Sequence, residues 1–98
     1  MILSRLRYFS PLMLGMVLGC TTIPMQEMSD ARQAVQAARE ANAAQLAPVP
    51  MESAETLLNK AKQALDAGAY DQARSEALAA RREAIKARSE ALKSAPAP

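Results

Sequence analysis

Three stretches of the chain repeat their apolar residues three and four positions apart, which is the spacing of one face of an α-helix. They cover about residues 25–47, 51–67 and 70–94. The residues that form these rows are Met28, Ala31, Ala34, Val35, Ala38 and Ala41 in the first stretch, Ala54, Leu57, Leu58, Ala61, Ala64 and Leu65 in the second, and Ala73, Ala77, Ala80, Ala84, Ala87 and Ala91 in the third. The pattern predicts an all-α domain of three helices over residues 25–94.

Proline and glycine separate the three predicted helices. The first helix is expected to end at Pro48-Val49-Pro50, because proline disfavours helical backbone in the residue before it, and Pro50 suits the first turn of the second helix. Gly68 should end the second helix, since glycine adopts positive φ without strain. The short connection at residues 68–70 makes the second and third helices an antiparallel hairpin, onto which the first helix folds back. Residues 95–98 are expected to form a Pro-rich disordered tail.

Beside its alanine row, the third predicted helix carries apolar, acidic and basic positions. These are Leu78, Ile85 and Leu92, which recur every seven residues, Glu76, Glu83 and Glu90, which do the same, and the arginines Arg74, Arg81, Arg82 and Arg88. We interpret the glutamates as a solvated helix face rather than as a metal-binding row. We also expect them to cancel most of the field of the arginines, which leaves those only a weak attraction for anionic lipid headgroups. On the second helix, Glu55 is placed to reach Lys60 or Lys62 only loosely.

The N-terminal region has the layout of a secretory signal. Arg5 and Arg7 precede an uncharged, largely apolar run of about a dozen residues, which is shorter than the roughly 20 residues that span a bilayer. The run ends in Val17-Leu18-Gly19-Cys20, which resembles the lipobox of bacterial lipoproteins. This resemblance implies that residues 1–19 are a signal peptide cleaved between Gly19 and Cys20. It also implies that Cys20 carries N-acyl and S-diacylglycerol groups and that residues 20–24 are a lipidated tether.

Cleavage would change the composition of the chain. Removing the first 19 of 98 residues leaves 79, and the loss of Arg5 and Arg7 lowers Lys plus Arg from 12 to 10, equal to the 10 Asp plus Glu. This balance provides no electrostatic case for nucleic-acid binding. The chain has no histidine, and its single thiol would be acylated. We therefore expect neither an enzyme nor a metal site, and no cofactor other than the covalent lipid on Cys20.

The whole pattern resembles the small bacterial lipoproteins of domain-of-unknown-function family 4398. The residues that carry the resemblance are Ala54, Glu55, Leu57, Leu58, Lys60, Ala61, Ala64, Leu65, Gly68, Tyr70, Asp71 and Ala73. Members of this family occur as short lipoproteins and as segments attached to a peptidoglycan-binding domain that resembles OmpA. The resemblance implies a role in the cell envelope and supplies no biochemical activity.

The segment from Gly68 to Ala73 also resembles the turn between the two helices of a tetratricopeptide repeat. In that turn, a glycine ends the first helix and a tyrosine packs between the two. We therefore interpret Gly68 and Tyr70 as helix-turn packing residues, in preference to Tyr70 as an exposed binding anchor. A single hairpin of this kind is not an array, because at least three repeats are usually needed for an independent solenoid.

Two functions are compatible with these features. The first is a lipid-tethered helical module that docks onto an envelope protein, whose identity the sequence does not give. The alternative is a structural homo-oligomer resembling the major Ala-rich outer-membrane lipoproteins, although Pro48, Pro50 and Gly68 would interrupt a continuous coiled coil. Thr21 follows the cysteine where inner-membrane lipoproteins of enterobacteria have aspartate, and this favours the periplasmic face of the outer membrane.

Overall fold

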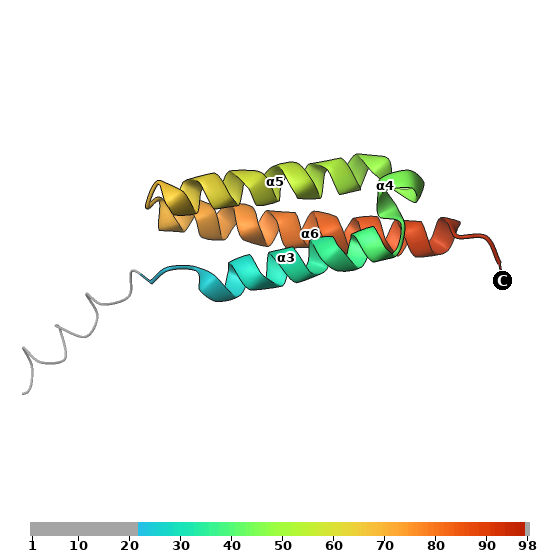
Figure 1. Ribbon diagram of the computed structural model, residues 1–98, viewed down its shortest axis with the longest axis horizontal. Coiled ribbons are helices and arrows are strands. Elements are labelled where there is room, and N and C mark those ends of the chain that lie inside the picture. The colour runs from blue at the N-terminus through green and yellow to red at the C-terminus, as the bar shows by residue number, and fades with distance from the viewer. Residues whose placement is uncertain (1–21, 98) are drawn as a thin grey trace, which may run out of the picture.

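The computed structural model describes residues 22–97, and within this range the chain is all-α, as predicted (Figure 1). Its helices are α3 (Met25–Glu40), α4 (Ala43–Leu46), α5 (Pro48–Asp66) and α6 (Tyr70–Ser94). The predictions for the signal peptide at 1–19, for Gly19, Cys20 and Thr21, and for the last residue of the tail lie outside the described range. Residues 95–97 are exposed and non-helical.

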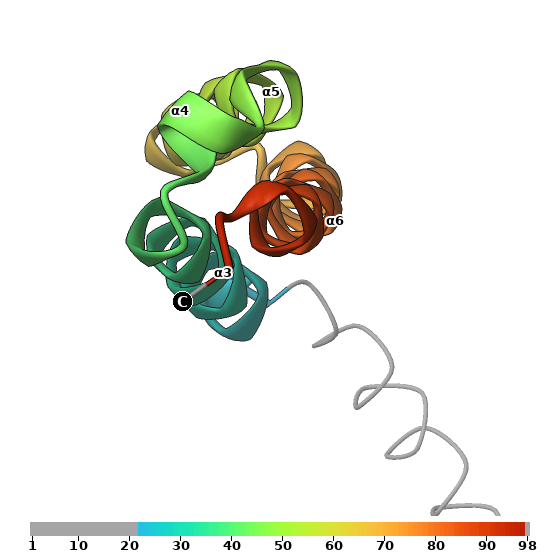
Figure 2. The same ribbon diagram turned by 90° about the vertical axis from the view of Figure 1, so that its right-hand side faces the viewer.

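The three long helices lie side by side and alternate in direction along the chain. α5 and α6 form the predicted antiparallel hairpin, and α3 packs against both of them while running in the same direction as α6 (Figure 1). Viewed from the end, the three helices stand at the corners of a triangle, with the short α4 at the end of the bundle where α3 gives way to α5 (Figure 2). The first helix therefore folds back onto the hairpin, as expected, rather than extending as a stalk.

The core of the bundle consists largely of alanine. All six alanines of the predicted row in α6 are completely buried, and Met28, Met51 and Val35 are the largest fully buried side chains besides Pro24. No polar or charged residue within 22–97 is buried. Small residues at a helix contact allow the helix axes to approach near the 8 Å lower limit of helix packing, so the core is thin but close-packed.

The first helix ends earlier than predicted. α3 stops at Glu40, and Asn42 adopts a left-handed conformation with φ of 67°. Asparagine tolerates this conformation better than most residues because its short polar side chain can bond locally. The Asn42 amide bonds to the Arg39 carbonyl at 2.9 Å, and the short α4 follows. The expected continuous helix over residues 25–47 is therefore wrong: the break comes from Asn42 within an alanine-rich run.

The prolines lie at the start of α5, which confirms the prediction for Pro50, while the first helix ends before it reaches them. Pro48 is the first residue of α5, and Pro50 also lies in its first turn. A proline in the first turn costs no hydrogen bond, because the amides there have no partner within the helix. The conflict of Pro48 with the preceding residue is absorbed by Ala47, which is extended at φ of −144°. The second helix thus begins at residue 48 rather than 51, and the chain reverses direction over residues 41–47.

The turn between α5 and α6 follows the prediction closely. Gly68 has φ of 77°, the Ala69 amide donates to the Ala64 carbonyl at 2.8 Å, and the Gly68 amide donates to the Leu65 carbonyl at 3.0 Å. This pair of hydrogen bonds is the Schellman motif, which satisfies carbonyls that the end of a helix would leave free. The positive φ at Gly68 therefore sets the point at which α5 ends and α6 can start.

No helix within residues 22–97 combines the length and the apolar character needed to cross a bilayer.

Replacing Gly68 should test the strain at this turn. A β-carbon at Gly68 would meet no atom within 4 Å, so the cost of Gly68→Ala comes from the positive φ alone. We expect Gly68→Ala to lower the free energy of unfolding by about 1 kcal/mol and Gly68→Asn to lower it less. Urea denaturation followed by circular dichroism measures both, and equal costs for the two variants would contradict this account.

Enlarging a buried alanine should test the close helix contact. Ala80 is completely buried, whereas its neighbour Ala79 is only partly buried. We expect Ala80→Leu to lower the free energy of unfolding by about 1–3 kcal/mol, because the helices must separate to admit the larger side chain. Ala79→Leu is the matched control and should change it by less than about 0.5 kcal/mol. Similar thermal midpoints for the two variants would show that the contact is loose.

Candidate interaction surfaces

Arg74 connects the first turns of α6 to α3 and to the segment that leads into α3. From the first turns of α6, its guanidinium donates to the Thr22 carbonyl at 3.1 Å, lies 3.8 Å from the Glu27 carboxylate of α3, and pairs with Asp71 at 3.3 Å. The Arg74 and Glu27 side chains are each about one-third exposed, so water screens their contact only in part, whereas Asp71 is almost fully exposed and its pair with Arg74 is largely screened. The chain that leads into α3 is therefore held against the beginning of α6.

Arg39 makes the corresponding contact towards the other end of α3. Its Nε lies 3.2 Å from the Glu55 carboxylate of α5. Glu55 thus pairs across helices, and within residues 22–97 no ion pair joins it to Lys60 or Lys62. Sequence spacing reveals pairs three or four residues apart, whereas Arg39 and Glu55 are 16 residues apart and meet only because the chain reverses between them.

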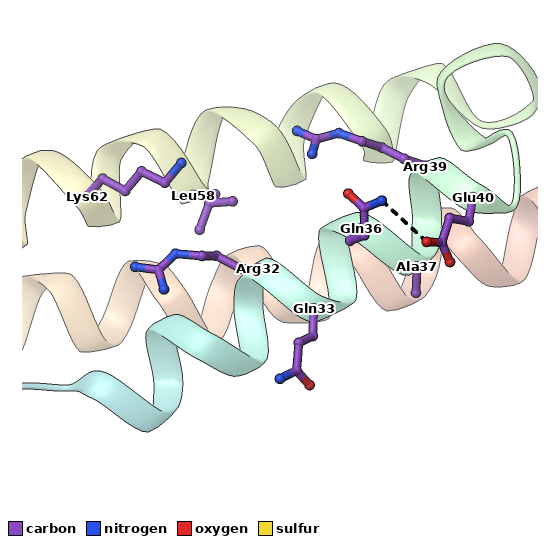
Figure 3. Close-up of a pocket in the computed structure, with 8 residues that line it drawn as sticks. All are labelled: Arg32, Gln33, Gln36, Ala37, Arg39, Glu40, Leu58 and Lys62. Atoms are coloured by element: carbon purple, nitrogen blue, oxygen red, sulfur yellow. Dashed lines mark hydrogen bonds between the residues drawn. The ribbon is translucent and has the colours of Figure 1, made fainter.

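α3 and α5 form a groove with a polar rim (Figure 3). It has a volume of about 490 Å³, and its lining residues are Arg32, Gln33, Gln36, Ala37, Arg39, Glu40, Leu58 and Lys62. The Leu58 side chain projects from α5 into the space between the helices and is only 5% exposed (Figure 3). Cationic side chains from both helices extend along this groove, while Gln36 donates a hydrogen bond to Glu40 at 3.3 Å. Within residues 22–97, Arg32 and Lys62 have no ion pair, whereas Arg39 is paired with Glu55. A recessed leucine beside these two cations suits a polypeptide that carries acidic groups.

The heptad residues of α6 do not enter the core. Leu78, Ile85 and Leu92 are 39%, 51% and 53% exposed. Successive residues of an α-helix are rotated by about 100° around its axis, so residues seven apart lie nearly on one line. The alanine row lies on another side of the helix. Both neighbouring helices pack on the alanine row, and no further helix within residues 22–97 covers the leucines and the isoleucine. They form an exposed apolar line.

The glutamates and two of the arginines lie on different sides of α6, and the expected cancellation of their fields stays a prediction. Arg81 and Arg88 line a groove between α6 and α3, together with Ile85 and Asp30. Glu76 lies on the other side of α6 and lines a groove against α5. Glu83 and Glu90 follow Glu76 at intervals of seven residues and share its side of the helix. Arg81 and Arg88 are therefore separated from the glutamates, whereas Arg82, Lys86 and Lys93 lie between Leu78, Ile85 and Leu92 on one side and the glutamate row on the other.

The glutamate row lacks the partners of a metal site. No group of three His, Cys, Asp or Glu residues within 22–97 is arranged to hold a metal ion. One Glu76 carboxylate oxygen accepts a hydrogen bond from Gln72 at 3.2 Å, and the other is buried without a partner. Tyr70, the other residue singled out from the sequence, is the first residue of α6 and is half-buried beside Gly68.

Residues 26–95 match the family described as "Domain of unknown function (DUF4398)". The chain belongs to this family. The matched range includes α3 from its second residue and all of α4, α5 and α6. The DUF4398 domain is thus the whole bundle, and its limits fall just inside the Thr22 contact and just beyond the end of α6. No curated protein and no solved structure gave a significant match to the chain.

Removing the Arg74 guanidinium should loosen the start of this DUF4398 domain. We expect Arg74→Met to lower the free energy of unfolding by about 1 kcal/mol, since it removes two partly exposed ion pairs and a charged hydrogen bond. Hydrogen exchange should accelerate most in the first turn of α3, around Met28. Arg82→Met is the control, because within residues 22–97 Arg82 has no ion pair. Unchanged exchange in that turn would contradict the role assigned to Arg74.

Proposed function

We propose that this protein is a non-enzymatic lipoprotein of the cell envelope, anchored by acylated Cys20 at the periplasmic face of the outer membrane. Its helical domain serves as an interaction module for an envelope protein. The signal-like region and Val17-Leu18-Gly19-Cys20 support the anchor. The groove between α3 and α5 carries the proposal of docking, because it combines a cationic rim with a recessed leucine.

The short distance along the chain between Cys20 and the bundle favours a module that stays next to the bilayer. Thr22 is held by Arg74 at 3.1 Å, and Cys20 precedes Thr22 by two residues. Two extended residues span at most about 7 Å. A lipid on Cys20 would therefore keep the Arg74 end of the bundle close to the membrane surface. Several acyl chains would make this attachment stable, since each buried CH₂ contributes about 0.8 kcal/mol.

The alternative is a structural oligomer of this chain, and the exposed line on α6 is the observation that favours it. Leucine and isoleucine at intervals of seven residues are typical of coiled-coil contacts. The adjacent charges oppose this arrangement. An antiparallel pair of α6 helices centred on Ile85 would place Arg82 opposite Arg88 of the second copy, and like charges at close range are unfavourable. The docking module is therefore the better-supported function.

Replacing the cysteine tests the anchor. In the producing cell, Cys20→Ala should yield an uncleaved precursor without lipid, because the thiol is the acylation site. Labelling with radioactive palmitate and gel electrophoresis measure incorporation and size. Cys20→Ser is a second variant that preserves the size of the residue and should behave identically. Unchanged palmitate incorporation in either variant would exclude lipidation at this position.

Site-specific photo-crosslinking in intact cells tests the docking surface. A photoreactive phenylalanine analogue at Gln36 in the groove should give one defined adduct with another envelope protein. The same analogue at exposed Asn59 on α5 is the control and should give none. Combining Arg32→Glu with Lys62→Glu should abolish the adduct at Gln36, because acidic partner groups would lose their cations. An adduct of twice the mass of the chain would instead identify a second copy and favour the oligomer.

A further inference from the structure

The outer face of α6 combines an apolar line with unpaired arginines. We call it the α6 outer face and define it by Leu78, Ile85 and Leu92 with Arg81, Arg82 and Arg88. The apolar line extends for about 21 Å, since its ends are 14 residues apart. The ion pairs within residues 22–97 involve Arg39 and Arg74, and none includes an arginine of this face.

The arginines flank the apolar line on both sides. Arg81 and Arg88 lie towards α3, where they share a groove with Ile85, and helix geometry places Arg82 on the opposite flank. Lys86 and Lys93 add two exposed cations next to Arg82. The acids near this face are Asp30 of α3, which lines the Arg81 groove, Asp71, which pairs with Arg74, and Glu83 and Glu90, which lie three and four residues from Lys86. Arg81, Arg82 and Arg88 have no acidic residue at these spacings on α6. The face therefore carries three arginines around an apolar centre.

The segment preceding α3 meets the bundle at one end of this face. Arg74 precedes Leu78 by one helical turn and lies almost on the line of Leu78, Ile85 and Leu92. Its guanidinium binds the Thr22 carbonyl at 3.1 Å. The described chain accordingly begins beside the first turns of α6, next to the Leu78 end of the apolar line. A lipid two residues before Thr22 would enter a bilayer next to this end of the face.

We propose that the α6 outer face lies on the surface of an anionic phospholipid bilayer, the same bilayer that holds the lipid of Cys20. This inference rests on the lipid anchor of the proposed function. Leu78, Ile85 and Leu92 enter the boundary between headgroups and acyl chains, while the arginines extend their stems along this boundary and contact phosphates. Each arginine near such a surface favours the bound state about 5-fold. The tether keeps the face at high local concentration, so three leucine-sized residues suffice for contact.

The observations favour a lipid surface over a protein on this face. A second copy of the chain would bring the arginines of both copies together. An acidic partner helix would also complement the charge, but nothing places such a helix at the end of the face where the tether begins. The groove between α3 and α5 is lined by residues of these two helices, and it shares Gln33 and Ala37 with the groove that holds Arg81, Ile85 and Arg88. Because α6 does not contribute to its lining, the groove between α3 and α5 would remain open to a partner with α6 on the bilayer.

Spin labels on the full lipoprotein test this orientation. The protein is purified from membranes with its lipid and reconstituted into phosphatidylethanolamine vesicles with or without phosphatidylglycerol. A nitroxide is attached at Ser89→Cys on the α6 outer face or, as the matched control, at Thr56→Cys on exposed α5. We expect the label at position 89 to collide several-fold more with membrane-dissolved oxygen, and less with an aqueous nickel chelate, than the label at position 56. The contrast should be larger with phosphatidylglycerol.

Charge variants test the role of the arginines. The label at position 89 reports how many bundles lie with α6 on the membrane and how many do not. In vesicles with phosphatidylglycerol, Arg81→Gln combined with Arg88→Gln should lower the ratio of the first population to the second about 5-fold per arginine. Arg32→Gln combined with Lys62→Gln removes the same charge from the groove between α3 and α5 and should leave the ratio unchanged. Circular dichroism checks that all variants keep their helices.

Three results would overturn the inference. If the protein floats with the vesicles while the label at position 89 stays in water, the anchor holds but the face does not lie on lipid. If that label is shielded in native membranes and exposed in vesicles, a protein covers the face instead. If the chain fails to float with either vesicle, the lipid anchor of the proposed function fails, and this inference fails with it.

Discussion

The structure depends on the close contact of α3 and α5 with the alanine row of α6. Six completely buried alanines allow both helices to lie against the same side of α6. Alanine contributes little apolar area, so the stability of this contact comes from short helix separation and high helix propensity rather than from large side chains. The larger buried side chains, Met28, Val35 and Met51, occupy positions on α3 and α5, where they fill the space that the alanines leave.

The same constraint accounts for what is exposed. Because the alanine row is used by both neighbours, the remaining sides of α6 face outward with their own chemistry, with Glu76 towards α5 and Arg81 and Arg88 towards α3. The polar contacts between helices therefore lie outside the core, at Arg74 near one end of α3 and at Arg39 near the other. The domain thus offers two surfaces with cations, one along α6 with an apolar line and one between α3 and α5 with a recessed leucine.

Periodicity was sufficient to predict the number of long helices and the buried positions of α6, because a row of alanines at intervals of three and four residues has one low-energy placement against other helices. The turn at Gly68 was equally predictable from the sequence, since the positive φ at this residue follows from its lack of a β-carbon.

The position of the reversal between α3 and α5 was not predictable from the prolines alone. Proline is compatible with both the end and the first turn of a helix, and the choice depended on Asn42, a single residue in a run of alanines. The charge separation on α6 and the Arg39–Glu55 pair depend on which helices are neighbours, which residue spacing does not specify.

The position of Thr22 determines how the bundle would respond to mechanical load. A pulling force applied through the N-terminal segment reaches the Arg74 hydrogen bond first and the first turn of α3 next. α3 runs in the same direction as α6, and the two ends of the described chain lie at opposite ends of the bundle (Figure 1). A pull along the bundle axis between these two ends therefore loads the contacts of α3 with α6 together, in shear, rather than one turn at a time. The bundle thus resists such a pull along the whole length of its alanine contact.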